Sequence, residues 1–131
     1  MVIIMDCLFC KIVKKEENAT ILYEDDIVKV FLDVNPNTNG HMLVVPKKHI
    51  TDFTVMDDET LTHIHHVIKD MKELIYDKLG AIGLKIVNNY GVEQLVKHYH
   101  VHIIPVYEEG SFEYKYADAS KIDEVFEKLT K

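Results

Sequence analysis

Short hydrophobic runs bounded by polar turn-forming residues recur along the chain, a pattern typical of β-strands. Five such runs predict strands, over residues 19–24, 27–33, 41–46, 84–88 and 98–104. Asp25 and Asp26 separate the first two runs closely enough for a hairpin, and the turn formers of residues 35–40 precede the third. Pro105 should end the fifth strand, because proline cannot donate to a sheet ladder.

The hydrophobic spacing changes from the strand period to the helical period between the third and fourth runs. Over residues 57–79, apolar side chains recur mostly three and four positions apart: Leu61, Ile64, Ile68, Met71, Leu74, Ile75 and Leu79. The acidic residues 57–59 would complement the N-terminal end of this helix, and Gly80 would end it. Shorter helices are predicted over residues 8–15 and 118–130.

Strands that follow one another through short loops favour an antiparallel sheet, and a long helix can cover one of its faces. The predicted fold class is therefore α+β: a five-stranded antiparallel sheet with one long helix, a short N-terminal helix and a C-terminal helical tail. At 131 residues the chain is long enough for a single domain with its own core, spanning residues 1–131.

Composition and charge exclude two classes of partner. The chain is 47% hydrophobic and 28% charged, as in ordinary globular proteins, and its net charge of −7 argues against nonspecific binding to nucleic acid. The apolar run of residues 1–5 is interrupted by Asp6 and has no basic flank, so we expect neither a signal peptide nor a membrane span. A cytoplasmic protein without a membrane partner is expected.

Cys7 and Cys10 form a Cys-x-x-Cys pair, which in a reducing compartment indicates a redox motif or half of a zinc site. A redox motif belongs near a βαβ pattern, and none is visible in the sequence. Zinc needs two more nitrogen or sulfur ligands, and spare histidines are available. Zinc is the favoured interpretation, and two half-buried thiols without a role are the alternative.

His98, His100 and His102 occupy alternate positions of the fifth predicted strand and therefore share one face, while the apolar residues between them face the other way. They could bind a metal, as three imidazoles do in some zinc enzymes. One of them could instead be a nucleophile toward phosphorus, oriented by its neighbours. A structural row of stacked imidazoles is least favoured, because it would bury polar atoms without evident partners.

The helix histidines are interpreted as solvated surface: His63, His65 and His66.

The run from His98 to Ile104 resembles the His-x-His-x-His-x-x signature of the histidine triad nucleotide-binding family, and Gln94 lies where that family usually has a glutamine. Further segments match the family in order and spacing: residues 8–12, 23–25, 31–36, 40–41 and 45–49. The likeness covers about residues 6–107 and leaves residues 108–131 as a C-terminal extension. The chain is most similar to the Hint-type or bacterial branch, which hydrolyses nucleoside phosphoramidates and related nucleotidyl conjugates.

The resemblance implies a different role for each histidine of the triad. His100 would attack the α-phosphorus and form a nucleotidyl-histidine intermediate, His102 would contact the phosphate oxygens, and His98 would support the site. Other polar residues would also reach the phosphate: Gln94 and either Asn88 or Asn89. This agrees with the chemistry of imidazole, which is a competent nucleophile in its neutral form at pH 7.

The resemblance also implies a nucleotide pocket and a structural Zn²⁺ site. Asp33 would hold the ribose hydroxyls, and apolar side chains would wall the base: Leu8, Phe9, Ile12, Phe31 and Val34. By analogy with zinc-bearing bacterial members, the metal ligands would form a Cys₂His₂ set: Cys7, Cys10, His49 and His98. A homodimer whose sheets join edge to edge is implied as well.

The implied function is hydrolysis of AMP- or GMP-type purine nucleoside monophosphate conjugates: phosphoramidates, acyl-adenylates or dinucleoside polyphosphates. Two alternatives stay open, namely a purine-nucleotide-binding regulatory or scaffold module with little turnover, and a metallohydrolase that uses the triad as its zinc site. Leu95 keeps the first alternative open, because Hint-type relatives have a serine there that can donate to the leaving group. The loop of residues 90–94 is also about one residue shorter than in many members.

Overall fold

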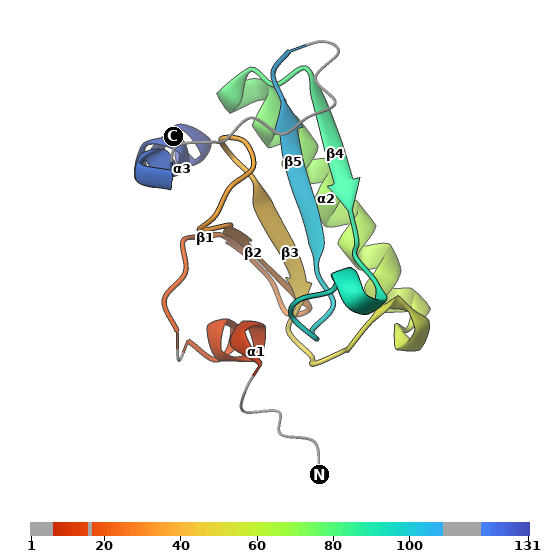
Figure 1. The fold of residues 1–131 in the computed structure, drawn as a ribbon. Coiled ribbons are helices and arrows are strands. Elements are labelled where there is room, and N and C mark those ends of the chain that lie inside the picture. Colours follow the sequence, from red (N-terminus) through yellow and green to blue (C-terminus); the bar gives the residue numbers. More distant parts are fainter. Residues whose placement is uncertain (1–6, 16, 109–118) are drawn as a thin grey trace.

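Five antiparallel strands form one sheet in the computed structural model, which describes residues 7–15, 17–108 and 119–131 (Figure 1). Their order across the sheet is β1–β2–β3–β5–β4. The bounds are β1 Ile21–Glu24, β2 Val28–Leu32, β3 Met42–Pro46, β4 Gly83–Val87 and β5 Val101–Val106. The predicted antiparallel α+β fold is confirmed, and the expected hairpin is the β1–β2 pair.

The fifth strand differs from its prediction at both ends. It begins at Val101 rather than at His98, and Pro105 lies inside it rather than ending it. β5 pairs with β3 only through residues 101–103, so the backbone of Pro105 lies past that ladder. There its carbonyl accepts a hydrogen bond from the hydroxyl of Thr38 (2.7 Å), while on its other side β4 continues to pair with β5, with Leu84 opposite Pro105.

The long helix α2, Asp58–Leu79, covers one face of the sheet (Figure 1). Asp57 caps its first turn by accepting from the backbone N–H of Thr60 (2.9 Å), and Gly80 ends it in the left-handed conformation with φ 71°. The main core lies between this helix and the sheet, and includes the fully buried Ile64 and Ile75. The predicted helix and both of its end signals are confirmed.

The short helix α1, Leu8–Val13, packs on the opposite face of the sheet. Its Phe9 and Ile12 join a second core cluster with Phe31, Leu43 and Val45 from β2 and β3. His102 pairs directly with Leu43 across the ladder, so its side chain points to the same face as this cluster. The sheet face opposite α2 is therefore where the candidate chemistry gathers.

The C-terminal helix α3, Ile122–Thr130, buries Val125 and Leu129 and packs against α2 and β1. It confirms the helical tail, although residue 118 of that prediction lies outside the described residues, as do the apolar residues 1–5. The loop before β5 contains a short 3₁₀ turn, Gly91–Glu93. Within residues 7–15, 17–108 and 119–131, no helix is both long and apolar enough to span a membrane.

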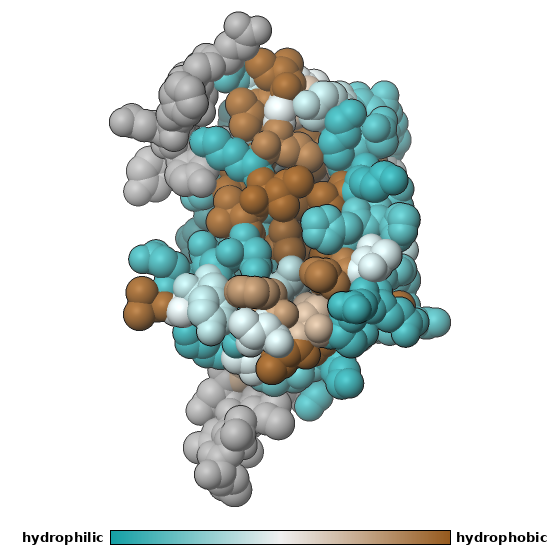
Figure 2. Space-filling view, turned by 90° about the vertical axis from the view of Figure 1, so that its right-hand side faces the viewer, coloured by the Kyte–Doolittle hydropathy of each residue, from teal (hydrophilic) through white to brown (hydrophobic). Residues whose placement is uncertain are grey.

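The strand β4 forms one edge of the sheet and lies on the side of the molecule that faces the viewer in Figure 2. Figure 2 shows a band of hydrophobic side chains running along this side. Ile82 and Ile86 are each 53% exposed at this edge. Exposed apolar side chains also follow in the next loop: Tyr90, Val92 and Leu95.

Candidate functional site

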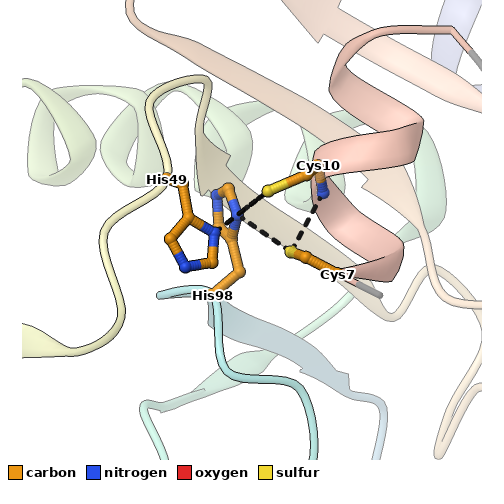
Figure 3. A group of neighbouring side chains, drawn as sticks. All are labelled: Cys7, Cys10, His49 and His98. Carbon is orange, nitrogen blue, oxygen red and sulfur yellow. Dashed lines mark hydrogen bonds between the residues drawn. The ribbon is translucent and has the colours of Figure 1, made fainter. Parts of the chain in front are cut away.

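Two cysteines and two histidines from three separate segments meet beside α1 (Figure 3). Cys7 and Cys10 come from the first turn of α1, His49 from the segment after β3, and His98 from the segment before β5. Their ligand atoms all lie within 4.8 Å of one another. The structure thus brings together the complete predicted metal set.

The geometry of this cluster suits a tetrahedral zinc ion. His98 Nδ1 lies 3.5 Å from Cys7 Sγ and 3.4 Å from Cys10 Sγ, and His49 Nδ1 lies 3.0 Å from Cys10 Sγ. Zinc–sulfur and zinc–nitrogen bond lengths in a tetrahedron place ligand atoms roughly 3.3–3.8 Å apart, close to most of these distances. The Cys₂His₂ composition is one that structural zinc sites use.

The surroundings of the cluster favour a bound cation. Nε2–H of His98 donates to the carbonyl of Pro46 (2.7 Å), which leaves the Nδ1 lone pair directed at the sulfurs. Burial, together with the neighbouring Cys7 thiol, raises the pKa of Cys10 to about 12. A thiolate at this position therefore needs a positive charge beside it, which a metal ion would supply.

A cavity of about 500 Å³ opens next to the cluster, on the same face of the sheet. Most of the predicted nucleotide-binding residues line it: Leu8, Phe9, Ile12, Phe31, Asp33, Val34 and Asn89. His100 and His102 line it as well. The lining therefore combines apolar side chains with imidazoles and a carboxylate, which suits a flat base joined to a polar group.

The side chain of His100 is fixed in one tautomer. Its Nδ1–H donates to the carbonyl of His98 (2.7 Å), so Nε2 keeps its lone pair. The ring of Phe9 packs edge-on against it, with centroids 4.8 Å apart and planes at 84°. Burial lowers the pKa of His100 below its usual value, so the imidazole is neutral at pH 7 and can act as a nucleophile.

His41 orients His102, and the sequence interpretation missed it as a functional residue. The backbone N–H of Asn37 donates to Nδ1 of His41 (3.0 Å), which places the proton of this imidazole on Nε2. That Nε2–H lies 2.9 Å from Nδ1 of His102, so His102 carries its own proton on Nε2. The sequence carried two signals for it: His41 belongs to a segment, residues 40–41, that resembles the family, and it is a polar residue at the head of the apolar run of residues 41–46.

Burial also makes this pair of imidazoles neutral. It lowers the pKa of His41, and burial together with the neighbouring His100 and His41 lowers the pKa of His102 to about 4. His102 therefore offers the cavity a neutral N–H donor at physiological pH.

Asp33 stands beside this pair but does not complete a metal site with it. Its Oδ2 lies 3.6 Å from Nε2 of His41, and its Oδ1 accepts from the backbone N–H of Asn35 (2.8 Å). A metal ligand needs a free lone pair, and Nε2 of His41 is already protonated because Asn37 donates to the other ring nitrogen. The protonated Nε2 of His41 therefore argues against a metal held by Asp33, His41 and His102 together.

Two predicted phosphate contacts point elsewhere. The amide of Gln94 is buried and donates to the carbonyl of Thr51 (2.6 Å), and the amide of Asn88 donates to the carbonyl of His100 (2.9 Å). Neither side chain lines the cavity, whereas Asn89 does. In this arrangement Gln94 and Asn88 hold backbone segments in place, and Asn89 is the asparagine that lines the cavity.

Among the helix histidines, the solvated-surface interpretation is wrong for His63. Its Nε2 lies 2.6 Å from Oδ2 of Asp25, so a carboxylate does stand beside it. Asp25 also accepts from Tyr23 (2.7 Å) and from the backbone N–H of Val28 (2.8 Å). The sequence could not reveal this pair, because the contact joins the β1–β2 turn to α2 across 38 positions. His65 and His66 are exposed, as expected.

Comparison with known proteins identifies the family. The family model of the HIT domain matches residues 14–109. An uncharacterised HIT-like protein of Methanocaldococcus jannaschii is 44% identical over 119 residues, covering 89% of this chain and 92% of the relative. An adenosine 5′-monophosphoramidase of Schizosaccharomyces pombe is 36% identical over 103 residues, covering 77% of this chain and 74% of the enzyme.

Solved structures of HIT proteins have the same fold as this chain. The crystal structure of a zinc-bound histidine triad family protein from Mycobacterium smegmatis superposes with a TM-score of 0.86 at 33% identity, covering 95% of this chain and 91% of the other. A HIT-like protein from Bartonella henselae gives a TM-score of 0.83 at 28% identity over 95% of this chain and 94% of the other. Sequence and fold lead to one conclusion: the chain belongs to the histidine triad (HIT) family.

Proposed function

We propose that this chain hydrolyses conjugates of purine nucleoside monophosphates at the α-phosphorus, through a covalent intermediate on His100. The conjugates in question are phosphoramidates, acyl-adenylates or dinucleoside polyphosphates. The observation that carries the proposal is the state of His100. Its Nδ1–H is engaged by the carbonyl of His98, and its free Nε2 belongs to a ring that lines a cavity of nucleotide size.

The reaction has two displacement steps. Nε2 of His100 donates its lone pair to phosphorus, a P–N or P–O bond to the leaving group breaks, and the departing atom takes up a proton from solvent water. The imidazolium formed on His100 is stabilised because its Nδ1–H already donates to a carbonyl oxygen. Water then attacks the phosphorus and loses a proton to solvent, the electron pair of the N–P bond returns to Nε2, and the nucleoside monophosphate leaves with His100 neutral again.

The other cavity residues would hold the nucleotide during both steps. The Nε2–H of His102 donates to a phosphate oxygen, where negative charge builds up as phosphorus gains a ligand. The Asp33 carboxylate accepts from the ribose hydroxyls, and Asn89 reaches the phosphate. Phe9, Ile12 and Phe31 form the apolar surface against which the base packs.

Zinc would serve a structural role in this scheme. The Cys₂His₂ cluster holds together α1, the segment after β3 and the segment before β5, and all four ligand positions are filled by protein atoms. Zinc bound there would fix the peptide of His98, whose carbonyl orients His100. The Zn-bound relative from M. smegmatis supports this assignment.

A homodimer joined through β4 fits the exposed surface. β4 is an edge strand, Ile82 and Ile86 are exposed at this edge, and Figure 2 shows an apolar band on the same side of the molecule. A second copy pairing there would bury this band and extend the sheet. We place the protein in the cytoplasm, where the cysteines remain reduced for metal binding.

Turnover of adenosine 5′-phosphoramidate tests the proposal directly. The wild type should release AMP and ammonia. His100→Ala should lose this activity by roughly 10⁴-fold or more while still binding AMP in calorimetry, because the nucleophile is absent but the pocket remains. His65→Ala, which removes an exposed helix histidine, is the matched control and should keep full activity. Unchanged turnover in His100→Ala would contradict the mechanism.

A nucleotide-binding module with little turnover is the second candidate. One observation favours it: Leu95 is 90% exposed at the edge of the cavity, where it cannot donate a proton to a leaving group. Tight AMP binding by the wild type with no hydrolysis of the phosphoramidate would select this candidate.

A further inference from the structure

Lys29 places an ammonium group inside the molecule, in the middle of β2. Every residue of this strand is buried, and Lys29 itself is only 1% exposed. Lysine is rarely buried to this extent unless its charge is paired, because removing an ammonium from water is costly. An aliphatic side chain would fill the core at this position equally well. The reason for a lysine must therefore lie in the groups that its ammonium contacts.

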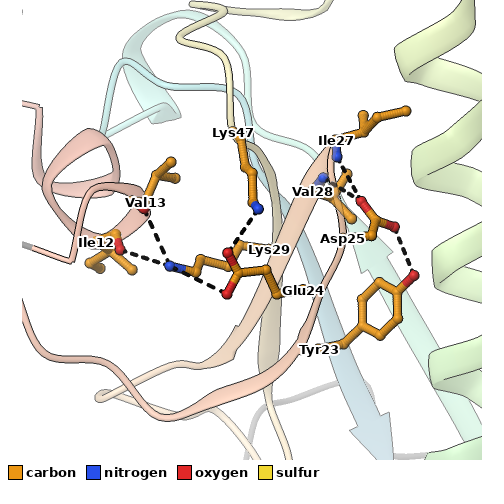
Figure 4. A network of polar contacts seen from close by, with 9 residues as sticks. All are labelled: Ile12, Val13, Tyr23, Glu24, Asp25, Ile27, Val28, Lys29 and Lys47. Atoms are coloured by element: carbon orange, nitrogen blue, oxygen red, sulfur yellow. Dashed lines mark hydrogen bonds and ion pairs between the residues drawn. The ribbon is translucent and has the colours of Figure 1, made fainter.

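The ammonium reaches the last carbonyls of α1. Its Nζ donates to the backbone oxygens of Ile12 (3.2 Å) and Val13 (3.3 Å), and lies 3.8 Å from a carboxylate oxygen of Glu24 (Figure 4). The final carbonyls of a helix have no N–H partner within the helix and carry partial negative charge. Lys29 therefore caps the C-terminal end of α1 from the neighbouring strand.

The helix needs such a tether. It has six residues, too few for a helix that is stable by itself. It also ends without glycine: Lys15 adopts the left-handed conformation with φ 65°, which is unfavourable for a side chain with a Cβ. The position of α1 is therefore set by contacts with other segments, at its first turn through Cys7 and Cys10 and at its last turn through Lys29.

The same helix forms one wall of the proposed nucleotide pocket. Ile12 lines the cavity and supplies one of the carbonyls that Lys29 holds. Phe9, one turn earlier, packs against the ring of His100 with centroids 4.8 Å apart. A shift of the last turn of α1 would therefore move the base-binding wall directly and would affect His100 only through Phe9.

We propose that Lys29 is a positioning residue for the nucleotide site: its buried ammonium holds the C-terminal end of α1 so that Ile12 and Phe9 wall the base. This rests on the proposed function for the identity of the ligand. Lys29 touches neither phosphate nor base, and it acts through the helix.

Lys29→Met tests this with Lys47→Met as the matched control. Both substitutions remove a lysine that pairs with Glu24, since Lys47 Nζ lies 2.8 Å from the same carboxylate, but only Lys29 reaches α1 (Figure 4). In calorimetric titration with AMP, we expect Kd to rise about tenfold for Lys29→Met and to stay within about twofold of wild type for Lys47→Met. The value of kcat should change less than KM, because His100 is held mainly by the carbonyl of His98.

Hydrogen exchange of the α1 amides, measured without nucleotide, provides a readout that does not depend on the ligand. It should be faster in Lys29→Met than in Lys47→Met, while exchange in α2 stays the same in both. Lys29→Gln, which keeps an N–H donor without the charge, should fall between Lys29→Met and wild type and serves if the methionine variant does not fold.

Two results would overturn the proposal: a wild-type Kd for AMP in the folded Lys29 variant, or unchanged exchange of the α1 amides. A wild type that fails to bind AMP would instead refute the proposed function, and the exchange rates would still decide whether Lys29 holds α1.

Discussion

Nε2 of His41 lies 2.9 Å from Nδ1 of His102, and this contact determines which nitrogen of His102 carries the proton. The direction of these hydrogen bonds is set by the backbone. The N–H of Asn37 can only donate, so Nδ1 of His41 must accept. Nε2–H of His41 then donates to Nδ1 of His102. The result is an N–H at Nε2 of His102, held without any net charge.

His41→Asn should therefore impair catalysis without emptying the pocket. The asparagine oxygen can replace Nδ1 as the acceptor for Asn37, but the side chain is too short to reach His102. His102 would lose its fixed tautomer and orientation, and we expect kcat/KM for adenosine 5′-phosphoramidate to fall about 10- to 100-fold. AMP affinity, measured in parallel, should change much less. Equal losses in affinity and in rate would mean that His41 only supports the fold.

The pH dependence of the rate should follow the burial of His100. Its neutral form is the nucleophile, and burial lowers its pKa below the usual value of 6.5. Protonation removes the lone pair, so kcat/KM should stay constant as the pH is lowered from 8 to the ordinary histidine pKa and should decline only below it. A pH series with a phosphoramidate substrate checks this. A fall in kcat/KM on the acid side whose midpoint lies above pH 6.5 would show that His100 is not the group that titrates.

The sequence could predict most of the fold because its signals were local. The spacing of apolar residues, Asp57 as a cap and Gly80 as a stop are properties of one segment, and α2 has those bounds. Pro105 misled because its effect depends on a neighbour: the ladder of β3 ends before it, and Thr38 satisfies its carbonyl. Nothing within residues 98–106 carries that information.

The candidate site likewise divides into residues that the sequence could identify and residues whose roles depend on contacts with distant segments. The spacing of Cys7 and Cys10 indicated half of a metal site, and the resemblance to the histidine triad family supplied the remaining ligands and the role of His100. The roles of His41, Gln94 and Asn88 depend on which backbone groups they meet, and those groups lie in other segments of the chain. Lys29 gave no signal at all, since a lysine between valines resembles the polar position of a half-exposed strand.

Removal of the cysteine ligands should release the metal and leave the chemistry in place. Purified wild-type protein is expected to contain about one zinc per chain, and Cys7→Ser/Cys10→Ser none. Without zinc the first turn of α1 loses its anchor, so the melting temperature should fall by roughly 5 °C or more. Residual hydrolysis by the double variant would confirm that zinc is structural. Zinc retained by this variant would place the metal elsewhere.

Leu95→Ser should convert the exposed residue at the edge of the cavity into a proton donor. Leu95 is 90% exposed, so its replacement costs no core packing, and a hydroxyl there could donate to the departing atom of the substrate. Assisted departure should raise kcat by about 10- to 100-fold for leaving groups that need a proton, such as simple amines. For leaving groups that depart readily as anions the gain should be small.

Val92→Ser is the matched control, since Val92 is 92% exposed in the same loop but does not line the cavity. If both variants hydrolyse amine conjugates at the wild-type rate, protonation of the leaving group does not limit this protein, and Leu95 is no obstacle to turnover.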